Sequence, residues 1–113
     1  NSAWIGIILG IFSLLIALVQ LLLPYTSIDQ EIEIPIRILA LLVSCQFLAI
    51  GFILYRDSKP IDLSALGDKA VVIAKALKWA IIGSFILTAI VNVISWIDLI
   101  IKITDTYQPG GEK

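Results

Sequence analysis

The fold is decided by residues 79–97, whose sequence reads WAIIGSFILTAIVNVISWI. None of these residues is charged. At about 1.5 Å per residue, a helix of this length matches the hydrocarbon core of a bilayer, which is about 30 Å thick. Trp79 and Trp96 stand near its two ends, where amphipathic rings favour the level of the lipid headgroups. The stretch therefore predicts a membrane-spanning helix with an aromatic anchor at each end.

One face of this predicted helix is polar. Its hydroxyl and amide side chains recur every three or four residues: Ser84, Thr88, Asn92 and Ser95. They fall within an arc of roughly 80°, and the opposite arc is entirely apolar. We call these four residues the polar stripe. Such a face favours protein or water over lipid, which leaves two interpretations open: packing against other helices, or the lining of a pore.

Composition narrows the class of protein. Of the 113 residues, 59% are hydrophobic, and the mean hydropathy is +1.02, whereas soluble domains are nearer half apolar. The net charge of −1 leaves no basic footprint for nucleic acid. Histidine is absent, and the single cysteine, Cys45, can form neither a disulfide nor a zinc cluster within one chain. We expect an integral membrane protein with no catalytic residue, no metal site, no cofactor and no bound nucleic acid.

A second apolar run, residues 3–23, carries a face of small side chains. They recur with alternating steps of three and four: Ala3, Gly6, Gly10, Ser13, Ala17 and Gln20. Gly6 and Gly10 form the close-approach motif of membrane helices, in which missing side chains let two backbones meet. We expect this face to pack against another helix. A face that lines a ligand site is the alternative, suggested chiefly by Gln20.

The remaining apolar run, residues 36–55, predicts another span. It has a packing face of its own: Ala40, Ser44 and Gly51. Arg37 and Arg56 flank the run, and we expect both, with Lys78, to anchor the helices by extending toward the membrane interface. Gln46, near the middle of the run, is expected to hydrogen-bond another helix.

The connectors between the runs differ in charge. The connector at residues 24–35 is acidic, and the alternation in Glu31–Ile34 predicts an extended segment, with Pro35 in the first turn of the next helix. The connector at residues 56–78 contains five basic residues: Arg56, Lys59, Lys69, Lys75 and Lys78. By the positive-inside rule, this basic connector lies on the cytoplasmic or stroma-like side and the C-terminus on the opposite side.

Further local structure is expected in and after the basic connector. Residues 60–66 predict a short helix that Gly67 stops, and residues 68–78 predict an interfacial lead-in that continues into the last span without a break. Asp98 and Lys102 are spaced for an ion pair along one helix. The tail, residues 105–113, is expected to be frayed.

The predicted fold class is an all-α integral membrane protein, one domain over residues 1–113, with three transmembrane helices and a short interfacial helix before the third. The expected function is that of a non-enzymatic membrane subunit, which serves as anchor, scaffold or assembly partner in a homo-oligomer or a larger membrane complex. A homo-oligomeric channel or transporter lined by the polar stripe is the alternative. A bilayer-shaping protein that uses residues 68–77 is a third interpretation.

Overall fold

A computed structural model describes residues 2–26, 29–59 and 64–106, and the ordered elements over these residues are all helical. They are listed in chain order: α1 (Ser2–Leu22), the 3-10 helix η1 (Leu23–Tyr25), α2 (Gln30–Asp57), the 3-10 helix η2 (Ser64–Lys69) and α3 (Ala70–Thr106). Each of α1, α2 and α3 is long and apolar enough to cross a membrane. This confirms the three long apolar helices that the sequence predicted.

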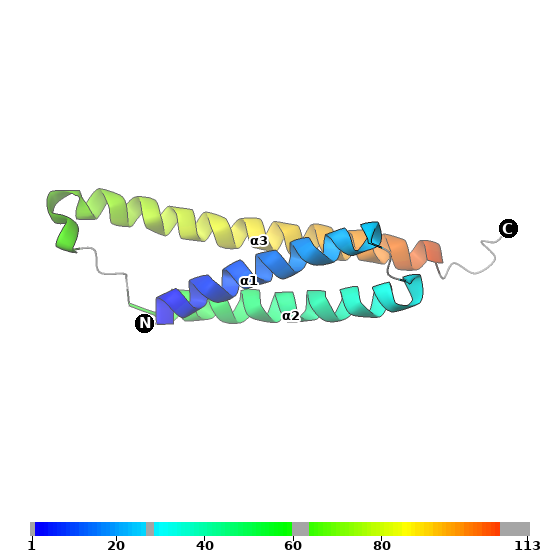
Figure 1. Cartoon of the computed structure of the whole chain (residues 1–113). Helices are drawn as coiled ribbons and strands as arrows, with labels where there is room; N and C mark the ends of the chain where they lie inside the picture. Colours follow the sequence, from blue (N-terminus) through cyan, green and yellow to red (C-terminus); the bar gives the residue numbers. More distant parts are fainter. Residues whose placement is uncertain (1, 27–28, 60–63, 107–113) are drawn as a thin grey trace.

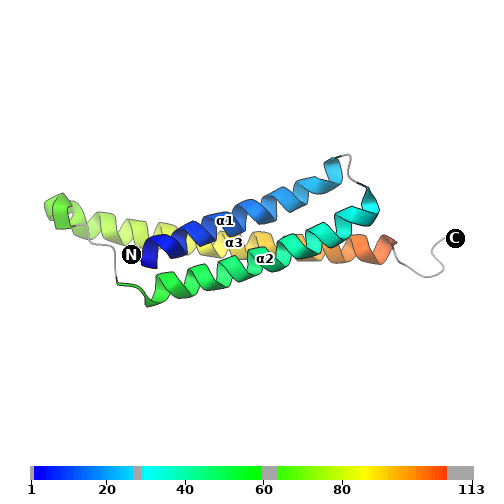
Figure 2. The same cartoon turned by 60° about the horizontal axis from the view of Figure 1, so that its bottom comes forward.

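The three long helices run up, down and up in a bundle of 68 × 24 × 20 Å (Figures 1 and 2). α1 and α2 form the closest pair, and α3 packs against both. One end of the bundle carries the C-terminus of α2, η2 and the N-terminus of α3, and we call it the basic end. The other end, where η1 joins α1 to α2, is the turn end. The first turns of α3 project past α1 and α2 at the basic end.

The start of α2 differs from the prediction. The helix begins at Gln30, so the predicted extended segment over residues 31–34 is wrong and Pro35 lies in the second turn rather than the first. Asp29 has extended backbone angles, and its carbonyl accepts hydrogen bonds from the amides of Ile32 and Glu33 at 3.0 and 2.9 Å. Burial of Ile34 and the ion pairs of Glu33 with Arg37 and Lys102 offset the one backbone hydrogen bond that proline removes.

Helix α3 includes the predicted lead-in. It runs from Ala70 to Thr106 without a break, as the pattern of residues 68–78 indicated. Gly67 has φ 68°, a left-handed conformation that favours glycine, and it bends the chain within η2 just before α3 begins. Residues 60–63, where the predicted short helix begins, and 107–113, most of the predicted frayed tail, lie outside the described residues. Asp105 and the residue after it belong to α3.

The contact between α1 and α2 is a backbone contact. A Cβ atom on Gly6 would lie 2.5 Å from the carbonyl oxygen of Gly51, and one on Gly51 would lie 2.7 Å from that of Gly6. A Cβ atom on Gly10 would lie 2.8 Å from the ring of Phe85 on α3. The two glycines of the predicted close-approach motif therefore face different neighbours. Gly6 lets α2 approach, whereas Gly10 leaves room for an aromatic ring.

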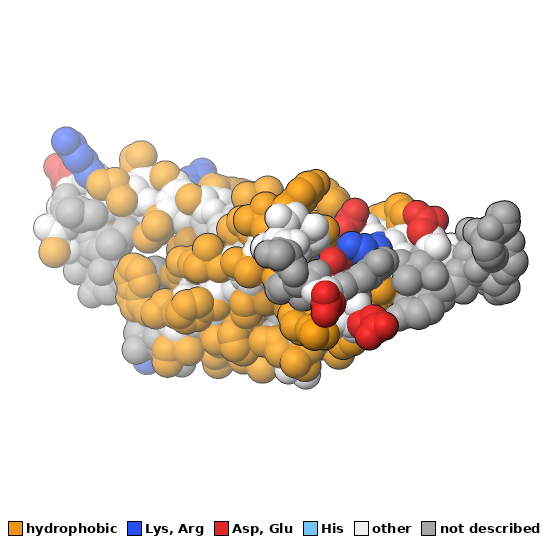
Figure 3. Space-filling view, turned by 45° about the vertical axis from the view of Figure 1, so that its right-hand side comes forward, with side chains coloured by type: hydrophobic (Ala, Val, Ile, Leu, Met, Phe, Trp, Pro, Cys, Tyr) orange, Lys and Arg blue, Asp and Glu red, His pale blue; other side chains and the backbone are white. Residues whose placement is uncertain are grey.

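The distribution of side chains is the reverse of that in a soluble protein. Among the described residues, more polar than apolar side chains are buried. The exposed surface carries many large apolar side chains along all three helices, and Figure 3 shows them covering the middle of the molecule, with charged groups gathered toward its ends. An apolar surface of this extent is compatible with a lipid environment.

The first prediction concerns the glycine contact. Replacing Gly6 by Ala should lower the free energy of unfolding by about 1–3 kcal/mol, because the new methyl group forces two backbones apart. The measurement is reversible unfolding in mixed detergent micelles, followed by circular dichroism.

Gly83 provides the matched control. A Cβ atom there meets nothing within 4 Å, so Gly83→Ala should be neutral or stabilising by up to about 1 kcal/mol through helix propensity. Equal stability of the two variants would show that α1 and α2 do not pack at Gly6.

Candidate functional site

Two layers of polar side chains lie between the helices, and each takes residues from all three. The hydroxyl layer, halfway along the bundle, consists of Ser13, Ser44 and Asn92. The ionic layer, toward the turn end, has five members: Gln20, Glu33, Arg37, Asp98 and Lys102. These layers are the only interior groups with the chemistry to form a site among the described buried side chains, apart from Thr88 and Ser95.

The hydroxyl layer joins α1 and α2 reciprocally. Ser13 Oγ lies 2.7 Å from the carbonyl oxygen of Ser44, and Ser44 Oγ lies 2.8 Å from that of Ser13. The two hydroxyl oxygens are 2.9 Å apart. Both side chains are fully buried. A serine hydroxyl reaches the backbone of a neighbouring helix only where the helices are close, so this pairing depends on the glycine contact.

Asn92 connects α3 to this pair. Its Oδ1 atom accepts from Ser44 Oγ at 2.8 Å, and its Nδ2 atom donates to the carbonyl of Thr88 at 2.8 Å and toward Ser13 Oγ at 3.5 Å. Because each hydroxyl has one proton, one consistent arrangement has Ser13 donating to the Ser44 carbonyl and Ser44 donating to Asn92. Every donor in the layer then has an acceptor.

Cys45 extends the layer toward the surface of α2. Its Sγ atom accepts from the indole nitrogen of Trp96 at 3.3 Å and donates toward Asn92 Oδ1 at 3.6 Å. The side chain is half-buried. The predicted anchor Trp96 is therefore also half-buried and bonded to the bundle.

The ionic layer is centred on Arg37, whose side chain is 0% exposed. Its Nε atom donates to Gln20 Oε1 at 3.0 Å, and its Nη2 atom donates to Asp98 Oδ2 at 2.8 Å. Its Nη1 atom lies 3.7 Å from Glu33 Oε2, one turn earlier on α2. The planar guanidinium thus links α2 to both other helices. The expectation that Arg37 extends outward to the interface is corrected, because internal acceptors compete successfully for it.

Glu33 connects the layer to Lys102 of α3 through an ion pair and hydrogen bond. Two cations and two carboxylates then cancel within the layer, which reduces the cost of placing charge away from water. The predicted pair of Asp98 and Lys102 is corrected by this arrangement. Asp98 pairs with Arg37 and Lys102 pairs with Glu33, because α2 presents a complementary charge to each of them.

Most of the residues singled out from the sequence face the interior. Of the polar stripe, Thr88, Asn92 and Ser95 are buried, whereas Ser84 is exposed. The hydroxyls of Thr88 and Ser95 donate to carbonyls one turn earlier on α3, at 2.8 and 2.7 Å. On the packing faces, Ala3, Gly6, Gly10, Ser13, Ala17, Gln20, Ser44 and Gly51 are buried, and Ala40 is half-buried.

The other predicted interface anchors are exposed. Arg56 is exposed and pairs with Asp57 at 3.1 Å. Lys78 and Trp79 are exposed on α3 near the basic end. Sequence reasoning missed Glu33 as a member of the ionic layer. Glu33 precedes Arg37 by four residues, a spacing that places both side chains on one face of a helix. The sequence analysis predicted an extended segment here, and in an extended segment this spacing indicates no contact.

Comparison with known proteins adds no relative: no family model, curated protein or solved structure matches this chain.

The chemistry of the layers is that of helix association. Their donors are bonded to acceptors in the same bundle, with the exception of Arg37 Nη1, which has no hydrogen-bond partner among the described residues. The two layers hold three helices in a fixed register.

The second prediction separates the ionic layer from surface charge. Replacing Arg37 by Gln should lower the free energy of unfolding by about 3 kcal/mol, because Asp98 and the buried Gln20 lose their partner. The expected loss lies at the lower end of the range for breaking a buried ion pair, because the Asp98 side chain is 55% exposed and water screens part of its charge. Detergent unfolding measures the change.

Arg56→Gln is the control with the same change of residue type. The Arg56 pair is exposed on both sides, so its loss should alter stability by less than about 0.5 kcal/mol. If the two variants were equally stable, the ionic layer would have no structural role.

Proposed function

We propose that this chain is a non-enzymatic membrane subunit that serves as an anchor, scaffold or assembly partner through helix packing. The observation that carries the proposal is the position of the Gln46 side chain. It stands in the middle of α2 on the outer, apolar face, and within the part of the chain that the structure describes its amide has no hydrogen-bond partner. The two other amide side chains described in the helices, Gln20 and Asn92, face inward.

Leaving this amide in lipid costs free energy, and a partner helix that hydrogen-bonds to it would remove that cost. A carboxamide carries two donors and one acceptor atom, and an unsatisfied amide in hydrocarbon costs several kcal/mol. Leu42 and Ile50, one turn away on either side, are half exposed and apolar. Ala49 is exposed beside them and is small enough to allow close approach. The outer face of α2 thus combines an apolar surface with one central polar group.

The simplest partner is a second copy of this chain. A carboxamide is self-complementary, because its nitrogen donates and its oxygen accepts, so two Gln46 side chains can pair across a twofold axis. A foreign helix with a polar group at mid-membrane has the same chemistry and would give a larger membrane complex. Both cases make the chain an assembly partner. The small-residue faces of α1 and α2 already pack against helices of the same chain. The outer face of α2 around Gln46 is therefore the face that we propose for association.

The alternative is a homo-oligomeric channel or transporter lined by the polar stripe. Such a lining needs water along the stripe. Three of the four stripe residues are buried against α1 and α2, and their hydrogen bonds close within the chain. This burial favours the packing role over the pore.

The proposed placement in the membrane follows from the charges. Residues 64–78 lie at the surface, with the basic end on the cytoplasmic or stroma-like side and the C-terminus on the opposite side. Trp79 sits at headgroup level on the basic side. The lipid bilayer is then the partner of the apolar outer surface.

The third prediction tests the contact at Gln46. In a Cys45→Ser background, Gln46→Cys should give a cross-linked dimer or a cross-link to a foreign subunit when native membranes are oxidised. The control is Ile90→Cys, at an exposed position near the middle of α3, which should stay monomeric. Gln46→Leu should weaken association about threefold, the equivalent of ~0.6 kcal/mol. Equal cross-linking at positions 46 and 90 would contradict a specific interface.

The fourth prediction tests the pore. In the same Cys45→Ser background, Thr88→Cys should resist a small charged thiol reagent in liposomes, because the position is 0% exposed. Asn92→Asp should destabilise the bundle, since it places a charge opposite Ser44 Oγ in a dry layer. Rapid modification at position 88 together with ion flux would establish the channel instead.

A further inference from the structure

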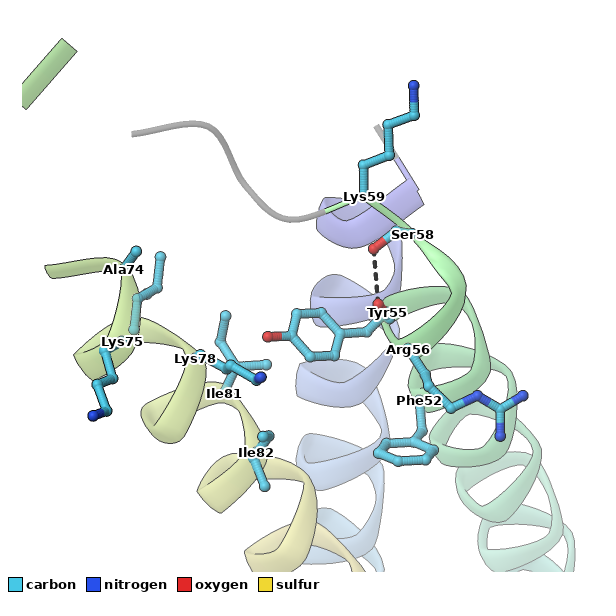
Figure 4. Close-up of a pocket in the computed structure, with 11 residues that line it drawn as sticks. Phe52, Tyr55, Arg56, Ser58, Lys59, Ala74, Lys75, Lys78, Ile81 and Ile82 are labelled. Atoms are coloured by element: carbon cyan, nitrogen blue, oxygen red, sulfur yellow. Dashed lines mark hydrogen bonds between the residues drawn. The ribbon is translucent and has the colours of Figure 1, made fainter. Parts of the chain in front are cut away.

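A cavity of about 610 Å³ opens at the basic end between the last turns of α2 and the first turns of α3 (Figure 4). Its apolar wall consists of Phe52 from α2 and of Leu77, Ile81 and Ile82 from α3. The cavity is separate from both polar layers, which lie further along the bundle.

The cavity exists because a ring holds α3 away from the other helices. Phe85 packs against Gly10 of α1, and it contacts the rings of Phe52 and Tyr55 at centroid distances of 5.5 and 5.8 Å. Three aromatic rings therefore fill the space between the helices at this level. Beyond them α3 continues past the end of α2 (Figure 1), and the cavity lies between these two helices.

The polar lining is cationic. Among the described residues it includes Arg56, Lys59, Lys75 and Lys78 and no carboxylate. Arg56 pairs with Asp57, but no described carboxylate lies within ion-pair distance of any of the three lysines.

The side chains nearest the middle of the cavity come from opposite walls. Figure 4 shows the hydroxyl of Tyr55 directed from α2 toward α3, and the ammonium group of Lys78 directed from α3 toward α2. Lys59 and Lys75 point outward from the rim. A cation and a hydroxyl donor thus face each other above an apolar wall.

We propose that this cavity binds an anionic phospholipid, with its phosphate between Lys78 and Tyr55 and the start of an acyl chain against Phe52, Ile81 and Ile82. Phosphate oxygens accept hydrogen bonds from ammonium and hydroxyl donors, and charge assistance strengthens those bonds. A free phosphate would satisfy the donors but leave the apolar wall exposed. A lipid satisfies both parts of the cavity, which is why we assign the site to a lipid.

The position of the cavity supports this ligand. Trp79, a residue type that favours the headgroup level, follows directly after Lys78 in the sequence. The lysines therefore stand at the depth of lipid phosphates, and the apolar wall lies on the hydrocarbon side of them. The site is independent of the proposed contact at Gln46, because the two lie on different parts of the bundle.

The test uses the full chain in phosphatidylcholine nanodiscs that contain spin-labelled phosphatidic acid or, for comparison, spin-labelled phosphatidylcholine. Electron paramagnetic resonance measures the motionally restricted fraction of each labelled lipid. The protein should prefer phosphatidic acid. Lys78→Gln should weaken that preference about fivefold, because the phosphate loses its charge-assisted hydrogen-bond donor in the cavity. Lys69→Gln should have little effect, because it removes the same charge at the same end but outside the cavity.

A steric variant tests the cavity without changing any charge. Ala74 lines the cavity on α3, and Ala74→Phe should fill it and abolish the preference for phosphatidic acid. Circular dichroism of each variant verifies that helix content is retained. An unchanged preference in Ala74→Phe, or equal losses in the Lys69 and Lys78 variants, would overturn the proposal. Displacement of the labelled lipid by millimolar inorganic phosphate would assign the site to soluble phosphates and overturn the lipid.

Discussion

The structure depends on the backbone contact between α1 and α2 at Gly6 and Gly51. Because neither residue has a side chain, the two helices meet closely enough for Ser13 and Ser44 to reach each other's backbone carbonyls. The paired hydroxyls then provide a donor for Asn92, which fixes the register of α3. In lipid there is no hydrophobic force between helices, so close packing and hydrogen bonds of this kind have to supply the association energy. One pair of glycines therefore sets the geometry of the polar interior.

The two polar layers satisfy their groups by different means. The hydroxyl layer uses neutral side chains near the centre of the bundle, where a net charge is most costly. The ionic layer lies toward the turn end and combines two cations with two carboxylates, so that the charges cancel locally. Arg37 suits this position, since its guanidinium donates in several directions and reaches both neighbouring helices. The basic end lacks such compensation, because three lysines around its cavity have no described carboxylate partner.

These differences divide the molecule into an internal scaffold and surfaces that remain available. The small-residue faces of α1 and α2 are used inside the chain, so the proposed association through Gln46 relies on a separate face of α2. The proposed lipid site depends on the same internal packing, since the ring of Phe85 against Gly10 keeps α3 apart from α2 at the basic end. A subunit built in this way would present one face to a partner helix and one end to anionic lipid, while its own helices stay in fixed register.

The sequence by itself determined the three long apolar helices, the continuity of α3 through residues 70–106 and the small residues on the packing faces, because helix length, hydropathy and spacing are local properties. It also indicated that the polar stripe avoids lipid, although Ser84 proved to be exposed. Only the tertiary structure decided that α2 begins at Gln30, that Arg37 is buried, and that Asp98 and Lys102 pair with α2 rather than with each other. The partners in those two pairs are 61 and 69 positions apart in the chain. Their pairing depends on the rotation and register of whole helices, and the periodicity of a single helix contains no information about either.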